Sequence, residues 1–168
     1  EVKNHASRGG AVLGICNGFQ ILLEAKLLNG ALIRNSKLKF ACKEVDLKVS
    51  TNINSPFLDK VNREDTIKLP IAHNEGNFFA DEKTLERIEG EGLVALRYYN
   101  ADSNSDYNPN GSINDIAGIL SENGKILGMM PHPERYIQKE LGGVDGYKFL
   151  KNSIENLSWV RLKNKIHL

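Results

Sequence analysis

A chain of 168 residues with 40% hydrophobic and 26% charged residues has the composition of one globular domain with a hydrophobic core. Its 22 Lys and Arg residues balance 21 Asp and Glu residues, and a formal net charge of +1 argues against nucleic acid or an anionic membrane as the main partner. The sequence contains no apolar run of membrane-spanning length, and its two cysteines, Cys16 and Cys42, form no Cys-x-x-Cys pair, so we expect a reduced, cytoplasmic protein.

The chain begins at Glu1, and the first strand-like run comes only after Gly10. We interpret the sequence as a fragment or processed form that begins within its domain. The apolar run 11–15 predicts a short buried strand, and residues 17–28 predict the helix that follows it. Gly30 then provides a left-handed cap for that helix.

The turn between this strand and helix has the sequence Gly-Ile-Cys-Asn-Gly-Phe-Gln over residues 14–20. A strand that turns into a helix at Gly-x-Cys-x-Gly is the cysteine form of the nucleophile elbow. We expect Gly14 and Gly18 to permit the tight turn, and the helix N-terminus to favour the thiolate of Cys16. A thiolate attacks carbonyl groups, so the turn predicts a nucleophile; a small buried cysteine at a strand end is the alternative.

The middle of the chain alternates between strand-like and polar segments. Strands are expected at 45–49, 66–72 and 94–99, and a helix capped by Asp81 is expected to end near Ile88. The segment 100–115 is rich in Asn, Ser and Asp and is interpreted as an exposed loop.

The C-terminal part begins with a hairpin signal, because Asn123-Gly124 separates the apolar runs 116–120 and 125–130. A helix is expected over 146–157, followed by a basic, loosely docked tail at 159–168. The proposed buried side of this helix consists of Tyr147, Leu150, Ile154 and Leu157. These elements together predict one α/β domain, residues 1–168, whose sheet is partly antiparallel.

A base for the cysteine is offered by Met-Pro-His-Pro-Glu-Arg at 130–135, directly after a predicted strand. In an extended segment, His132 and Glu134 point to the same side, because side chains alternate along a strand. His132 could then take the thiol proton while Glu134 fixes the tautomer of the ring. The alternative is a rigid loop that carries a surface histidine and a Glu-Arg pair.

Four segments in order carry a family resemblance: 14–20, Leu-Pro-Ile-Ala-His-Asn-Glu-Gly at 69–76, Asn-Pro-Asn-Gly-Ser at 108–112, and Gly-Met-Met-Pro-His-Pro-Glu-Arg at 128–135. Together they closely resemble the PurQ-like glutaminase subunits of phosphoribosylformylglycinamidine synthase, within the class I (triad) glutamine amidotransferases. The resemblance runs from about residue 10 to 157. It implies a flavodoxin-like α/β fold with a mixed sheet flanked by helices, of which the first strands are missing here.

The resemblance also implies a catalytic triad. Cys16 would attack the side-chain amide of glutamine, with His132 as general base and then acid, and with Glu134 orienting His132. Ammonia would leave first, and water would then hydrolyse the thioester to glutamate. The backbone N–H of Asn17 would form one arm of the oxyanion hole.

Three further residues match positions expected to bind substrate: Gln20, His73 and Gly76. Two of them also have a structural interpretation, since Gln20 could simply cap the elbow and His73 could simply satisfy a loop. Asn74 stands where the family usually has glycine, so this loop is expected to be stiffer or differently shaped.

A second departure concerns a Pro-Gly-Gly-containing loop of the family, which donates the second oxyanion-hole N–H and which no residue before Gly10 supplies. Loss of one such donor costs about a hundredfold in rate or more. We therefore expect the isolated chain to be a weak or inactive glutaminase.

The resemblance implies partners but no cofactor or metal for this chain. The ammonia would pass to a large ATP-dependent synthetase subunit that makes formylglycinamidine ribonucleotide in purine biosynthesis, with a small bridging subunit assisting; ATP and magnesium would belong to that partner. Two alternatives stay open. One is another class I enzyme, such as the glutaminase of GMP or imidazole glycerol phosphate synthesis or a gamma-glutamyl hydrolase. The other is a non-catalytic, truncated subunit that only binds the synthetase.

Overall fold

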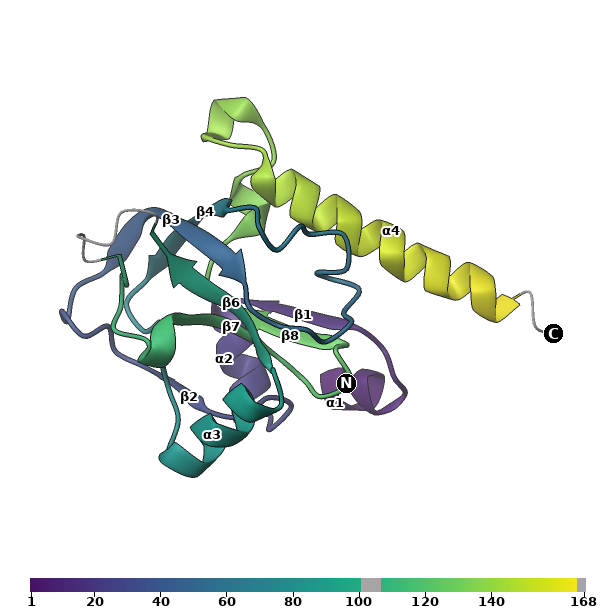
Figure 1. The fold of residues 1–168 in the computed structure, drawn as a ribbon, viewed down its shortest axis with the longest axis horizontal. Helices are drawn as coiled ribbons and strands as arrows, with labels where there is room; N and C mark the ends of the chain where they lie inside the picture. The colour runs from purple at the N-terminus through teal and green to yellow at the C-terminus, as the bar shows by residue number, and fades with distance from the viewer. Residues whose placement is uncertain (101–106, 166–168) are drawn as a thin grey trace.

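The computed structural model describes residues 1–100 and 107–165, and over 158–165 it describes the course of the backbone. A six-stranded sheet forms the centre of the molecule, and a separate two-stranded ribbon lies beside it (Figure 1). In spatial order the large sheet consists of β1 (Val12–Ile15), β8 (Ile126–Met129), β7 (Ile116–Leu120), β6 (Val94–Tyr99), β3 (Ala41–Val49) and β4 (Ile67–His73). The ribbon pairs β2 (Ala31–Ile33) with β5 (Asn77–Phe79). The helices are α1 (Val2–Ser7), α2 (Asn17–Glu24), α3 (Glu82–Gly90) and α4 (Asp145–Lys165).

The sheet is mixed, as predicted. β1 runs parallel to β8, whereas the pairs β8–β7, β7–β6, β6–β3 and β3–β4 are antiparallel. The predicted hairpin joins β7 to β8, and Gly124 in its turn has a φ of +69°. Because the two strands before Cys16 and His132 are parallel neighbours, both strands end at the same edge of the sheet.

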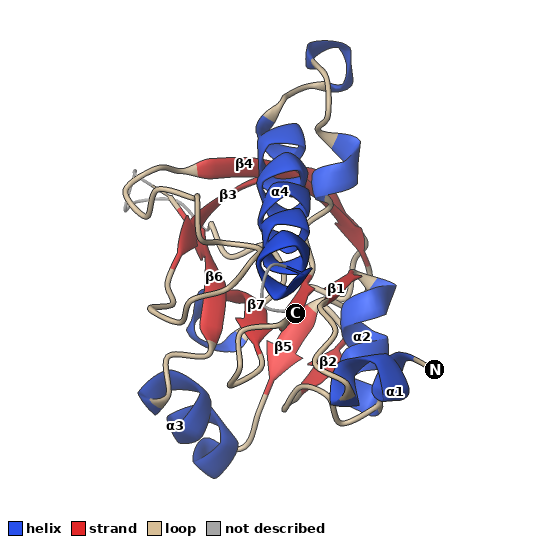
Figure 2. Cartoon of the chain, turned by 90° about the vertical axis from the view of Figure 1, so that its right-hand side faces the viewer, coloured by secondary structure: helices blue, strands red, loops and turns tan. Residues whose placement is uncertain are grey.

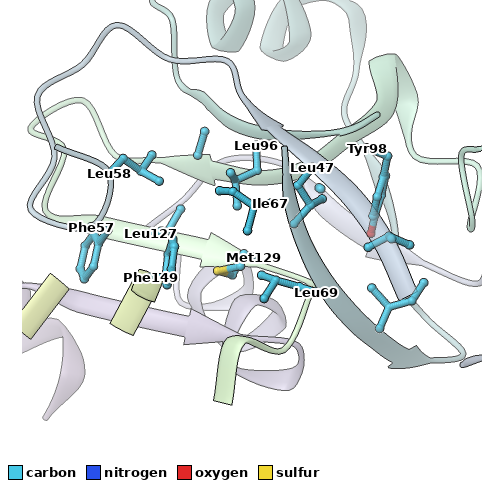
Figure 3. Close-up of a cluster of buried hydrophobic side chains, with 14 of the residues drawn as sticks. Leu47, Phe57, Leu58, Ile67, Leu69, Leu96, Tyr98, Leu127, Met129 and Phe149 are labelled. Atoms are coloured by element: carbon cyan, nitrogen blue, oxygen red, sulfur yellow. The ribbon is translucent and has the colours of Figure 1, made fainter. Parts of the chain in front are cut away.

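Two hydrophobic cores lie on opposite faces of the sheet. Alternation along β8 sends Leu127 to one core and Ile126 to the other. Helix α4 covers the first face with Phe149, as Figure 2 and the close-up in Figure 3 show. Helix α2 covers the second face with Phe19 and Leu22.

Most elements lie within a few residues of their predicted positions, including α3 with Asp81 as its N-cap, whose side chain accepts a hydrogen bond from the Thr84 N–H at 2.9 Å. The end of α2 was predicted too late. The helix stops at Glu24, and Lys26 adopts a left-handed φ of +61°. Gly30 therefore belongs to the loop that follows, rather than to a helix cap.

The C-terminal helix was also predicted incorrectly. Helix α4 continues to Lys165, so most of the expected tail at 159–168 is helical; residues 166–168 lie outside the described part of the chain. Its buried side chains include Phe149 and Ser153, whereas Tyr147 is 51% and Ile154 64% exposed. Leu150 and Leu157 of the predicted side do pack, partly buried, against the first core, so the prediction holds for these two residues and is wrong for Tyr147 and Ile154.

The segment 100–115 is not simply an exposed loop. Residues 101–106 lie outside the described part, but Asn110 and Ser112 are fully buried, for reasons that emerge at the site below. Helix α1, over residues read as preceding the first strand, was not predicted and buries none of its side chains. Among the described residues, no helix is long and apolar enough to cross a membrane.

Candidate active site

The turn after β1 holds Cys16 in a strained backbone conformation. Its φ of 53° and ψ of −107° make it the N-cap of α2, and its N–H donates to the Met129 carbonyl at the end of β8 at 2.8 Å. A Cβ on Gly14 would lie 2.7 Å from the Gly18 carbonyl oxygen, so this close approach requires glycine. A Cβ on Gly18 would meet nothing within 4 Å, and the expected steric need for glycine there is absent.

His132 lies three residues after the end of β8, whereas Cys16 directly follows β1. Its N–H donates to the Pro70 carbonyl at 2.8 Å, which fixes this segment against β4. The residues Pro133–Arg135 form a 3-10 turn instead of the expected extended segment. The expected contact nevertheless forms, because this turn folds Glu134 back until its Oε1 lies 2.6 Å from His132 Nδ1.

This contact determines which nitrogen of His132 is available. A carboxylate accepts, so the hydrogen of the neutral ring lies on Nδ1 and the lone pair on Nε2. His132 Nε2 is buried and has no hydrogen-bond partner among the described residues. Arg135 Nε lies 3.6 Å from the same oxygen of the half-exposed Glu134 carboxylate.

The thiol of Cys16 is not prepared as a thiolate, contrary to expectation. Burial raises the pKa of Cys16, while the Asn17 backbone N–H and the Arg135 charge lower it by less, and Glu134 raises it further. The sulfur lies 4.0 Å from both the Ala72 carbonyl oxygen and Asn17 Oδ1, and these two are its hydrogen-bond acceptors among the described residues. Burial therefore disfavours the thiolate, and the sulfur contacts Ala72 and Asn17 rather than His132.

A pocket of about 450 Å³ brings the nucleophile and the base together. Its wall consists of Ile15, Cys16, Asn17, Gln20, Phe40, Ala72, His73, Asn74, Glu75, His132 and Arg135. Of the residues expected at the site, Glu134 lies behind the wall, where it contacts His132. Gly76 also lies behind it. The Gln20 amide lines the pocket but donates to Glu24 on its own helix at 3.0 Å.

The wall opposite Cys16 rests on a buried polar network that sequence analysis missed. Asn35 Oδ1 lies 3.1 Å from His73 Nδ1 and accepts from the Gly76 N–H at 3.1 Å. The Gly76 carbonyl accepts from Asn110 Nδ2 at 2.7 Å and from the Ser112 hydroxyl at 3.2 Å. The backbone of Gly76 is thus fully used inside the protein, and the segment 108–112 supports the site loop from behind.

His73 is neutral in this setting. Burial lowers its pKa to about 4, with a further contribution from the nearby His132. Its Nε2 is buried and has no hydrogen-bond partner within the described ranges, as is the case for His132. Two imidazoles, each with a buried Nε2 that has no partner among the described residues, therefore border the same pocket.

The pocket also carries one acidic and one basic residue, Glu75 and Arg135, beside the exposed ring of Phe40. The described residues contain no cluster of three or more His, Cys, Asp or Glu side chains that could hold a metal ion. The charged groups of the pocket suit a small ligand that carries both charges, such as a free amino acid.

Comparisons with known proteins relate this arrangement to an enzyme family. A family model described as a CobB/CobQ-like glutamine amidotransferase domain matches residues 1–145. The phosphoribosylformylglycinamidine synthase subunit PurQ of Thermus thermophilus is 51% identical over 157 residues, which cover 94% of this chain and 69% of that protein. The subunit of the same name from Brucella abortus is 54% identical over 145 residues, which cover 86% of this chain and 62% of that protein.

A solved structure gives the same relationship. A chain in the structure of PurLQS from Thermotoga maritima matches with a TM-score of 0.77 and 41% sequence identity. The match covers 94% of this chain and 66% of that chain, so this chain spans about two thirds of the length of its relatives.

Proposed function

We infer the function from a premise that the comparisons provide: the chain belongs to the CobB/CobQ-like glutamine amidotransferase family, among its PurQ-like members. We propose that it hydrolyses glutamine to glutamate and ammonia as the glutaminase subunit of a phosphoribosylformylglycinamidine synthase. The observation that carries the proposal is the pair formed by Cys16 and His132 at the ends of parallel β1 and β8, with Glu134 on His132 Nδ1.

The first half of the reaction makes a thioester. His132 Nε2 takes the thiol proton, and the Cys16 sulfur attacks the side-chain carbonyl carbon of glutamine. The N–H of Asn17, next to the nucleophile, stabilises the developing oxyanion. The proton then passes from His132 to the departing nitrogen, which leaves as ammonia.

The second half releases glutamate. His132 takes a proton from water, the water oxygen attacks the thioester carbon, and the proton returns to the sulfur of Cys16. Glu134 keeps the ring oriented and stabilises the imidazolium in both halves. The thiol first has to turn from the Ala72 carbonyl toward His132, and we propose that occupation of the pocket produces this rotation.

The charges of the pocket support an amino acid as substrate. Glu75 and Arg135 are available for the α-ammonium and α-carboxylate groups of glutamine, while the side chain reaches Cys16. Gln20 can join these contacts if its amide leaves Glu24.

We propose that the ammonia is used by a large synthetase subunit, with a small subunit completing the complex. The similarity to a chain of the Thermotoga maritima PurLQS structure supports this assignment. We further propose that this chain needs no cofactor of its own, that ATP and magnesium act in the synthetase subunit, and that the complex works in the cytoplasm. The two free cysteines, Cys16 and Cys42, fit a reducing compartment.

A glutamine-mimicking electrophile, such as the diazo ketone analogue of glutamine, tests the proposal. We expect it to label Cys16 and not Cys42, so that Cys16→Ala abolishes labelling and Cys42→Ala, which changes an exposed cysteine of β3, leaves it unchanged. Labelling by a general thiol reagent alone would contradict a glutaminase site and favour a subunit that only binds the synthetase.

A further inference from the structure

The amide of Asn35 has one orientation that satisfies its surroundings. Its side chain is fully buried, and its Nδ2 donates to the carbonyls of Lys39 at 2.8 Å and His73 at 2.9 Å. On its other side, Oδ1 accepts from the Gly76 N–H. If the amide were turned over, two oxygens would face its oxygen and an N–H would face its NH₂ group, which buried groups do not tolerate.

The orientation of Asn35 decides the tautomer of His73. Since Asn35 Oδ1 can only accept, His73 Nδ1 must carry the hydrogen of their 3.1 Å contact. Because the ring is neutral, its Nε2 then has a lone pair and no hydrogen. This Nε2 is the buried atom without a partner.

Gly76 holds the ring in place from one side. A Cβ at this position would lie 2.3 Å from His73 Cε1, so the ring lies directly on the glycine backbone. With Nδ1 engaged by Asn35 and the ring packed on Gly76, Nε2 is the polar atom of the ring that stays without a partner among the described residues, and His73 is one of the residues that line the pocket.

His73 lies at the reacting end of the pocket. The carbonyl oxygen of Ala72, its neighbour on β4, lies 4.0 Å from the Cys16 sulfur, as does Asn17 Oδ1, and the charge of His132 adds to burial in lowering the pKa of His73. The other titratable groups of this pocket are Glu75 and Arg135. A ligand that reaches Cys16 therefore occupies the pocket that His73 also lines.

We propose that Asn35 is a positioning residue that holds His73 in the Nδ1–H tautomer, so that Nε2 accepts a hydrogen bond from the substrate and makes the pocket prefer a carboxamide to a carboxylate. This selectivity rests on the proposed glutaminase function. A carboxamide donates to such an acceptor, whereas a carboxylate places a second lone pair against it. The same lone pair on His73 Nε2 that accepts from glutamine would repel the carboxylate of the product glutamate and favour its release.

Nitrogen NMR spectra of the His73 ring test the positioning role without any turnover. We expect the unaltered chain to show one tautomer at neutral pH, with hydrogen on Nδ1 and none on Nε2. Asn35→Ser removes the acceptor, and we expect the single Nδ1–H signature to be lost. Asn77→Ser is the matched control, because Asn77 lies on the adjacent β5, contacts the Arg34 carbonyl and not His73, and should leave the signature intact. Hydrogen on Nε2 in the unaltered chain would overturn the proposal, even if Asn35→Ser failed to fold.

Binding measurements test the selectivity. In a Cys16→Ala background, which prevents turnover, we expect the ratio of the glutamate to the glutamine dissociation constant to fall about tenfold or more in both Asn35→Ser and His73→Phe. His73→Phe retains a ring against Gly76. An equal loss of affinity for both ligands would show that His73 is merely structural and would overturn the selectivity. If glutamine did not bind at all, the proposed function and the selectivity would fail together, while the NMR result would still decide the role of Asn35.

Discussion

The contact between His132 and Glu134 joins a buried imidazole to a carboxylate that solvent reaches. Glu134 is 46% exposed over its side chain, whereas His132 is almost fully buried. The carboxylate can therefore orient the ring, but water screens part of its charge. Its contribution should be smaller than that of a fully buried third member of a triad.

We expect Glu134→Gln to lower kcat for glutamine hydrolysis by about ten- to a hundredfold, less than the roughly 10⁴-fold loss known for a buried orienting aspartate. The amide can turn its NH₂ group toward Nδ1 and favour the wrong tautomer. Steady-state production of glutamate measures the effect. Glu140→Gln, which changes an exposed carboxylate in the turn Lys139–Leu141, is the control, and an unchanged kcat in Glu134→Gln would exclude the orienting role.

The neutral His73 makes stability depend on pH in one direction. Its pKa is about 4 in the folded chain and 6.5 when unperturbed, so the unfolded chain binds the additional proton between these values. The contribution of neutral His73 to the free energy of unfolding is complete above pH 6.5, and it is lost as the pH falls from 6.5 to about 4. This difference in the pKa of His73 corresponds to about 3 kcal/mol of the free energy of unfolding.

We therefore expect the free energy of unfolding in urea to decrease steeply over that range. His73→Phe should flatten this part of the profile, while His5→Phe, which alters a histidine of the exposed helix α1, should not. A profile that is the same for the unaltered chain and His73→Phe would show that His73 does not resist protonation.

At the scale of elements, the approach of α2 to β1 depends on one glycine. A Cβ on Gly14 would be 2.5 Å from Leu22 Cδ1 and 2.7 Å from the Gly18 carbonyl oxygen, so β1 and α2 would have to separate. We expect Gly14→Ala to destabilise the chain by about 1–3 kcal/mol.

Gly18→Ala provides the matched control, because the same added methyl group meets nothing within 4 Å. Within a helix, alanine is favoured over glycine by about 0.5–1 kcal/mol, so this variant should be at least as stable as the unaltered chain. Thermal or urea unfolding of the two variants checks the difference. Equal losses would mean that the turn does not depend on the closeness of strand and helix.

The parts of the site that sequence could predict are those encoded by neighbouring residues. The elbow at Cys16 and the hairpin at Asn123-Gly124 depend on local backbone preferences, and both were predicted at the right place. The pair of His132 and Glu134 was also predicted, although a 3-10 turn and not an extended segment brings the two side chains together.

The support behind the site could not be predicted in this way. Asn35 and Asn110 resemble ordinary loop residues, and they become buried only because the segments around Gly76 provide their hydrogen-bond partners. A polar side chain in a loop gives no local signal of such a partner. The Asn-Pro-Asn-Gly-Ser segment was noticed as a family marker, yet its polarity led to the expectation of an exposed loop.

At the scale of the whole molecule, the free chain lacks an aligned nucleophile. Burial disfavours the thiolate of Cys16, the sulfur contacts Ala72 and Asn17 Oδ1 rather than His132, and the backbone N–H of Asn17 lies next to it. We expect the purified 168-residue chain to hydrolyse glutamine slowly, at a rate about a hundredfold or more below that of an enzyme with a complete oxyanion hole. We expect the cognate synthetase subunit to raise this rate.

Glutamate release with and without the synthetase subunit measures this dependence. Cys16→Ala should stay inactive under both conditions, which separates the reaction at this site from any glutaminase carried by the partner. Rapid turnover by the chain alone would contradict the prediction and show that the thiol realigns without help.

The parallel pairing of β1 with β8 has a consequence for how the enzyme comes into being. Synthesis on the ribosome delivers β1 well before β8, and the intervening strands must close a long loop before the two can meet. Cys16 is therefore synthesised well before His132, the residue proposed to take its proton. We therefore expect the growing chain to have no glutaminase activity until β8 has been synthesised and has paired with β1.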